Sequence, residues 1–209
     1  MMRVDKIAAQ PDRVGRFKVS FDDGTIMRLY RQTVQDFSIY RGQEFTEEQM
    51  RALQDAANTM SAKMRAVRIV AASNVSKKDL QQRLIHKGES PEKAKEAVRW
   101  MEDLNLVDDR VTAESIVRKC IQKGYGLSRA KQMLYEKRIP NECWEDVLQY
   151  YPDQTEYIVS FLESHLVKES DPRQLRKVID ALLRRGHNYN QIRKALKIVE
   201  ADIDTLPEG

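Results

Sequence analysis

Few side chains in this sequence have the types and spacing that catalysis or metal binding requires. Asp108 and Asp109 could work as an acid–base pair or hold a cation, but adjacent acids before a helix usually cap its N-terminus. The histidines His86, His165 and His187 lie in different parts of the chain, so we expect surface or packing roles for them. Neither group of residues predicts a reaction centre.

Cysteine usage and loop motifs also argue against enzyme chemistry. Cys120 and Cys143 are the two cysteines, and they show neither CxxC spacing nor a histidine placed to complete a zinc site. A catalytic thiol at Cys120 would need an activating base, and none is identifiable. The sequence contains no GxxxxGK[ST] or GxGxxG phosphate-binding loop. We therefore expect no enzyme activity, no cofactor and no metal.

The two tryptophans admit two interpretations. Trp100 and Trp144 fall within predicted helices, where packing into a core is the default. An aromatic side chain next to Arg99 could instead anchor a partner protein.

Charge is distributed unevenly along the chain. The net charge of +4 over 209 residues is small, but residues 61–140 hold 18 basic against 10 acidic residues. Residues 141–170 hold one lysine against seven acids, and residues 171–197 hold eight basic against two acidic residues. These blocks are either solvated helix faces or parts of a binding surface, and the sequence leaves both open.

The sequence predicts no membrane segment. No apolar run approaches the roughly 18 residues that span a bilayer. The N-terminus carries Asp5 and Lys6 where a signal peptide needs its apolar region. We expect a soluble, cytoplasmic protein.

The N-terminal part predicts a β-hairpin over residues 14–30. Apolar and polar residues alternate along its first half, which places the apolar side chains on one face. Asp23-Gly24 then suits a tight turn. A lone hairpin is marginally stable, so we expect a third strand over residues 3–9 or a covering helix.

Helical patterning begins near residue 47 and continues to about residue 200. Thr46 and Gln49 have the spacing of a capping box at the start of this region. A repeat of about 50 residues organises the rest of the chain, since segments 80–88, 130–138 and 178–186 share apolar first and fifth positions. The shared anchors are Leu84, Leu134 and Leu182, followed by Ala94, Trp144 and Ile192, then by Ala97, Val147 and Ala195, and by Val98, Leu148 and Leu196.

Each copy of the repeat is long enough for three helices. Glycine ends the second helix of the first and last copies at Gly88 and Gly186, after a basic last turn. Arg138 occupies the equivalent position in the middle copy, so we expect a different turn geometry there. The predicted helices cover residues 60–73, 76–87 and 91–104, then 109–123, 127–138 and 141–151, then 154–169, 172–185 and 189–201.

The predicted fold is mainly α. Tandem three-helix, helix-turn-helix-like repeats stack on one another and bury apolar surface that a single small unit would leave exposed. Such stacking favours an elongated curved array. A small N-terminal β-hairpin extension precedes them. The expected parts are a β-rich extension (1–45), a connecting helix (46–59), repeat 1 (60–107), repeat 2 (108–153), repeat 3 (154–201) and a tail (202–209).

Four stretches resemble the RecX family of bacterial RecA regulators. They run from Ser76 to Gly88, from Leu106 to Ala113, from Gly126 to Ile139 and from Leu182 to Ile192. Each stretch alone is a weak signal of the family, but the order and spacing of the four together are specific for it. The resemblance spans about residues 46–197. The sequence departs from the family pattern at Val75, Ala130 and Arg138.

The resemblance implies a regulator that binds RecA, or its filament on single-stranded DNA, and alters recombination, ATP hydrolysis and the coprotease activity of the SOS response. We also expect a monomer, which could make weak direct contact with DNA. Several basic residues that could meet the partner stand at helix ends, where helix termination is an equally good explanation. The candidate partner-binding residues are Lys87, Arg118, Lys119, Lys123, Arg129, Lys131, Lys137, Arg138, Arg184, Arg185, Arg193 and Lys194.

Two other functions stay open. Three-helix units resemble helix-turn-helix modules, and the basic blocks could follow a phosphate backbone, which would make this a direct DNA-binding protein. The acidic segment 141–170 argues against an uninterrupted DNA track. A structural scaffold for another protein is the third possibility.

Overall fold

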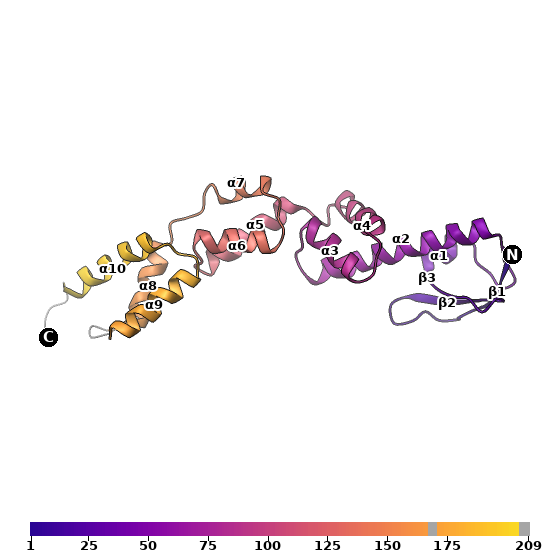
Figure 1. Ribbon diagram of the computed structural model, residues 1–209, viewed down its shortest axis with the longest axis horizontal. Coiled ribbons are helices and arrows are strands. Elements are labelled where there is room, and N and C mark those ends of the chain that lie inside the picture. Colours follow the sequence, from indigo (N-terminus) through magenta and orange to yellow (C-terminus); the bar gives the residue numbers. More distant parts are fainter. Residues whose placement is uncertain (167–170, 205–209) are drawn as a thin grey trace. The chain divides into compact units, whose positions relative to one another are not determined.

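The computed structural model describes residues 1–166 and 171–204, with side chains described as far as residue 200. Within these ranges the chain is mainly helical, with one small antiparallel sheet near the N-terminus (Figure 1). This confirms the predicted fold class. The chain divides into two compact units, which meet in sequence between Val107 and Asp108. That division coincides with the proposed limit between repeats 1 and 2.

The N-terminal sheet contains the predicted hairpin. Arg16 pairs with Tyr30 and Val19 with Met27 across it, in antiparallel register. The predicted third strand is also present and pairs with the first strand of the hairpin, while a two-residue fourth strand was too short to predict. In the order β3-β2-β1-β4 the sheet consists of β1 (Met2–Ile7), β2 (Arg16–Phe21), β3 (Ile26–Tyr30) and β4 (Glu44–Phe45).

One face of the sheet is covered by helices, which is what a small sheet needs for stability. Val19 and Leu29 are completely buried there, and Leu53 from helix α2 packs against them. A six-residue helix, α1 (Arg31–Asp36), follows β3 directly and was not predicted. It carries no side-chain cap, so it lacked a sequence signal.

Helix α2 (Glu47–Ala72) joins the sheet to the first repeat (Figure 1). The predicted capping box is confirmed, because Thr46 accepts a hydrogen bond from the Gln49 backbone and the Gln49 side chain accepts one from the Thr46 backbone. The proposed limit at residue 60 lies inside this helix, since the sequence between the two expected helices contains neither glycine nor proline.

The first repeat is completed by α3 (Lys77–His86) and α4 (Pro91–Asp103). They pack on the second half of α2, where Ala62 and Ala66 are fully buried. These small side chains let the helices approach closely, and Leu80 and Leu84 fill the space between them.

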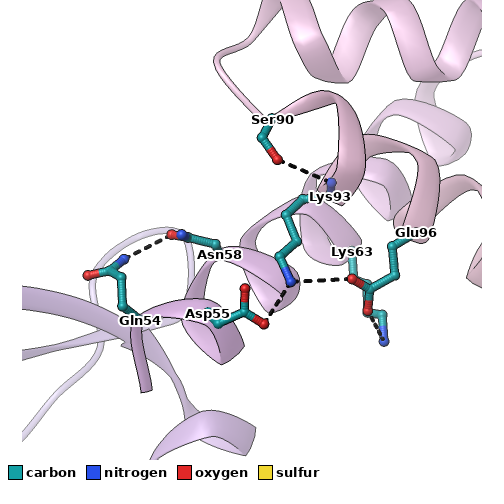
Figure 2. A network of polar contacts seen from close by, with 7 residues as sticks. All are labelled: Gln54, Asp55, Asn58, Lys63, Ser90, Lys93 and Glu96. Carbon is teal, nitrogen blue, oxygen red and sulfur yellow. Dashed lines mark hydrogen bonds and ion pairs between the residues drawn. The ribbon is translucent and has the colours of Figure 1, made fainter. Parts of the chain in front are cut away.

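A network of polar contacts ties α4 to α2 on the surface of this repeat (Figure 2). The Lys93 ammonium donates to Asp55 of α2 at 2.8 Å and lies 3.5 Å from Glu96. Glu96 is also 4.0 Å from Lys63 of α2. The hydrogen bond to Asp55 raises the pKa of Lys93 above its ordinary value. These cations are therefore already paired within the protein.

The second repeat comprises α5 (Asp109–Gln122), α6 (Leu127–Glu136) and α7 (Glu142–Leu148). Its core is built by α5 and α6, through residues such as Ile116 and Leu134. Helix α7 was predicted over residues 141–151 but is shorter and contains no buried residue. Asn141 makes no capping hydrogen bond there, so the third helix of this copy is weakly defined.

The third repeat comprises α8 (Thr155–His165), α9 (Pro172–Arg184) and α10 (Tyr189–Asp204). Ile158, Leu182 and Ile192, one from each helix, are at most 1% exposed and form the centre of its core. The end of the predicted helix 154–169 and most of the predicted tail 202–209 lie outside the described residues.

The repeat pattern is confirmed by burial. Leu84, Leu134 and Leu182 are all completely buried at equivalent places in the second helix of each copy. Among the downstream positions, Ala94 and Ile192 are buried, whereas Trp144 is half-buried because it belongs to the short helix α7. One sequence pattern thus specifies three similar cores.

The expectation of a different turn at Arg138 is wrong. Arg138 has φ +56°, in the same left-handed region as Gly88 at +93° and Gly186 at +88°. The backbone hydrogen bonds also match, because Ile139 N donates to Leu134 O as Glu89 N does to Leu84 O. The buried residues on either side, Leu134 and Ile139, hold the turn in this geometry even with a side chain present.

Replacing Arg138 with glycine should therefore stabilise the second repeat. A non-glycine residue in the left-handed region costs about 1 kcal/mol, and the Arg138 side chain is exposed, with little packing to lose. We expect the free energy of unfolding to rise by about 0.5–1 kcal/mol, measured by urea denaturation. Arg138→Ala is the control, since it removes the charge but keeps the strained backbone. A rise of the same size in both variants would contradict this explanation.

Candidate partner-binding junction

The turn between α5 and α6 meets the turn between α9 and α10, so repeats 2 and 3 contact each other through backbone. Gly126, the N-cap residue of α6, donates its N–H to the Arg185 carbonyl at 2.9 Å. A Cβ atom at Gly126 would lie 2.1 Å from the Gly186 carbonyl oxygen. Glycine is required at this position by the closeness of the two chain segments, not by its backbone angles.

His187 is buried at the centre of this contact, with 3% of its surface exposed. Its Nε2 lies 3.0 Å from the Gly124 carbonyl oxygen, which can only accept, so Nε2 carries a proton. Nδ1 has no hydrogen-bond partner among the described residues. Burial lowers the pKa of His187, the hydrogen bond to Gly124 opposes that shift, and the charge of Arg185 adds to it. The imidazole is therefore neutral in the junction.

Aromatic rings fix the basic side chain beside His187. The Tyr157 ring stacks on the His187 ring with centroids 5.9 Å apart. Arg185 donates to the Tyr157 hydroxyl, and its guanidinium lies 4.8 Å from the centre of the Phe161 ring. Arg185 is thus held in place by contacts inside the protein, and only part of it faces solvent.

Other basic residues gather around the same two turns. Both Lys123 and Arg129 are close enough to Cys120 for their charges to oppose the rise in the pKa of its thiol that burial causes. The backbone of Arg129 lies against Gly186. Lys194 lines a hollow of about 490 Å³ together with Gly126. We call the group formed by Lys123, Arg129, Arg184, Arg185 and Lys194 the basic junction; Arg184 is the exposed last residue of α9.

The remaining predicted residues lie elsewhere. Arg118 and Lys119 are on α5, Lys131, Lys137 and Arg138 lie along or just after α6, and the Arg193 guanidinium lies 5.4 Å from the centre of the Tyr189 ring. Lys87 belongs to the other unit.

Most of the predicted cations of the second unit, unlike Lys93 and Lys63, form no ion pair with a described residue. Arg129 is an exception, because its guanidinium lies 3.6 Å from Glu136. In the described part of the chain, no ion pair within 4.0 Å involves the exposed Arg118, Lys119, Lys123, Lys131, Arg138, Arg184, Arg193 or Lys194. Their charges are available to an acidic partner.

The residues first considered for catalysis have structural roles. Asp108 caps α5, as predicted, by accepting from the backbone N–H groups of Arg110 and Val111 at 2.7 and 3.1 Å. His165 stacks on Phe161 with ring centroids 4.1 Å apart, while His86 is exposed at the end of α3.

Both tryptophans are half-buried. Trp144 donates from Nε1 to the Ile139 carbonyl at 3.1 Å, and Trp100 packs against the core of the first repeat. The described residues include no group of three or more metal-binding side chains placed to hold an ion. None of the described helices is long and apolar enough to cross a membrane.

Sequence inspection missed the residues that build the junction. Tyr157 was not singled out, and His187 was expected to serve a general packing or surface role. Gly126 appeared only as part of a resemblance. The sequence did predict that Gly186 ends the second helix of the third copy, but the contact of this turn with the turn between α5 and α6 depends on how the repeats pack.

Comparisons with known proteins agree with this architecture. Residues 108–148 match the family model for RecX, second three-helix domain. The chain is 26% identical over 200 residues to a protein named Regulatory protein RecX from Clostridioides difficile, covering 92% of this chain and 93% of the relative. A Vibrio cholerae protein of the same name is 30% identical over 142 residues, covering 66% of this chain and 92% of the relative.

Two solved structures share the fold. A crystal structure of a regulatory protein RecX has a TM-score of 0.65 at 21% identity and covers 96% of this chain and all of the other. RecX from Lactobacillus salivarius has a TM-score of 0.60 at 23% identity, covering 70% of this chain and 99% of that one. With the sequence matches and the repeated three-helix architecture, these likenesses lead to one conclusion: this chain belongs to the RecX family of regulatory proteins.

Proposed function

We propose that this protein binds RecA, or the RecA filament on single-stranded DNA, and regulates its recombinase, ATPase and coprotease activities. Membership of the RecX family is the observation that carries the proposal, because the curated relatives are named regulatory proteins. The basic junction is the contact surface that we propose within the second unit.

The charges of the basic junction support this assignment. Lys123 and Arg184 are exposed, with no ion pair to a described residue, so an acidic surface could approach them without first breaking internal contacts. Beneath them, the hydrogen bond from Gly126 to Arg185 and the burial of His187 keep the two turns in a fixed arrangement. A preorganised surface loses less conformational entropy on binding than a flexible one.

The test is RecA's ATP hydrolysis on single-stranded DNA, measured with the full chain at substoichiometric and equimolar ratios. We expect a dose-dependent change in rate. The variant Lys123→Glu with Arg184→Glu should raise the concentration needed for half the effect about 10-fold, since it reverses two interface charges without disturbing Arg185.

The matched control is Lys95→Glu with Arg99→Glu. Both residues are exposed on α4 in the other unit, and the double variant changes the net charge by the same amount. It should act like the unmodified protein. No effect of the folded, unmodified protein on its cognate RecA would refute the proposed function, whereas equal loss in both variants would refute the basic junction as the contact surface.

A further inference from the structure

We propose that a hollow between α2 and α3 in the first unit binds a phosphodiester group of single-stranded DNA, directly and without RecA. The hollow measures about 440 Å³ and has Ile69 and Ala72 among its lining residues. Its basic lining residues are Arg65 and Arg68 from α2, Arg83 from α3 and Lys87 just after α3. Only Lys87 among these was predicted to bind a partner.

Two of the arginines are held in position by acids. Arg83 donates from Nε to Asp79 at 3.2 Å, its second terminal nitrogen lies 2.9 Å from the other oxygen of Asp79, and it also donates to Ser73. The Nε of Arg65 lies 2.9 Å from Glu89, and another of its nitrogens donates to the Lys87 carbonyl. These contacts fix two planar guanidinium groups at the rim of the hollow before any ligand arrives.

The other two cations keep their charge unpaired. Arg68 is exposed, and its guanidinium donates to the neutral Tyr30 hydroxyl at 3.3 Å. Lys87 is exposed, and no ion pair of its ammonium group is found among the described residues. With Asp79 and Glu89 balancing Arg83 and Arg65, the hollow has an excess of two positive charges. An anion is therefore the ligand class that it suits.

The form of the hollow favours a nucleic-acid backbone over a free phosphate. Its cations come from side chains at an open surface, and the α3 end that it borders is a C-terminus, whose carbonyls do not attract anions. A free, strongly hydrated phosphate gains little binding free energy at such a site. A nucleic-acid strand gains more, because each phosphate contact releases counterions and contacts with neighbouring nucleotides strengthen the same binding event.

The experiment measures fluorescence anisotropy of a labelled oligothymidine with the full chain, across salt concentrations and without RecA. Arg68→Gln with Lys87→Gln removes the two unpaired cations and leaves both acid-bound arginines in place. We expect affinity at low salt to fall about 10-fold and the salt slope to become shallower by about 0.7, because the one phosphate that the hollow neutralises contributes about 0.7 to that slope on a single strand.

Lys95→Gln with Arg99→Gln is the control for net charge, since these residues lie on α4 and do not line the hollow. It should leave affinity and slope unchanged, and circular dichroism should show both variants folded. Equal losses in the two variants, or none in the first, would overturn the proposal. Displacement of the oligonucleotide by millimolar inorganic phosphate, while chloride of equal ionic strength has no effect, would overturn it in favour of a free-phosphate site. Because RecA is absent throughout, failure here is distinguishable from failure of the proposed function.

Discussion

Replacing Gly126 with alanine is expected to detach the third repeat from the second. The added Cβ would lie 2.1 Å from the Gly186 carbonyl oxygen and 2.5 Å from the His187 nitrogen, and these are backbone atoms that cannot rotate away. The clash should cost about 3 kcal/mol, at the upper end for overpacking, and break the hydrogen bond from Gly126 to Arg185.

Hydrogen exchange of the full chain, followed by mass spectrometry, measures this effect locally. Amides in the turn between α9 and α10 should exchange about 100-fold faster in Gly126→Ala, while those of α3 and α4 keep their protection. Gly88→Ala is the control, because its Cβ would meet no atom within 4 Å and only the backbone angle is strained. Similar exchange at the α9–α10 turn in both variants would show that close approach is not what holds the repeats together.

Lowering the pH should loosen the same junction through His187. Burial holds the pKa of this imidazole below its ordinary value of 6.5, so the open state binds a proton more readily than the closed state. The contribution to stability is fully present above about pH 6.5. As the pH falls below that value it is lost, by at most about 1.4 kcal/mol per pH unit, until the lowered pKa is passed. Protonation would place an unpaired N–H beside Arg185.

His187→Gln separates this titration from the general effects of acid. A glutamine amide can still donate to the Gly124 carbonyl, but it does not titrate in this range. Protection of the α9–α10 turn, corrected for the intrinsic pH dependence of exchange, should fall between pH 7 and 5 in the unmodified protein and stay nearly level in the variant. A parallel fall in both proteins would rule out His187 as the titrating group.

Local sequence signals located the helices of this protein well. The capping residues Thr46 and Asp108 each accept the hydrogen bonds that the sequence predicted, because a cap involves only residues within one turn. Periodicity also identified the core, since Leu84, Leu134 and Leu182 are all buried. The short elements α1, β4 and α7 were missed or overextended, because a few residues hold too little pattern to define an element.

Arg138 shows where a local rule failed. The absence of glycine predicted a changed turn, but the left-handed geometry is retained, because hydrogen bonds and the buried Leu134 and Ile139 outweigh a local cost of about 1 kcal/mol. The sequence also could not distinguish basic residues that are held inside the protein from those that face solvent. Arg185 and Lys123 were predicted alike as partner-binding residues, but Arg185 contacts Tyr157 and Phe161 whereas Lys123 is exposed.

The sequence by itself determined the three-helix repeats, the N-terminal hairpin and the family, because these depend on the order and spacing of residues along the chain. Only the tertiary structure decided that Gly126 faces Gly186, that His187 is buried beneath Tyr157, and that Arg68 and Lys87 border one hollow. The residues of these pairs lie 19 to 60 positions apart in the sequence. No local pattern encodes them, because they form only when whole helices have packed and their ends meet.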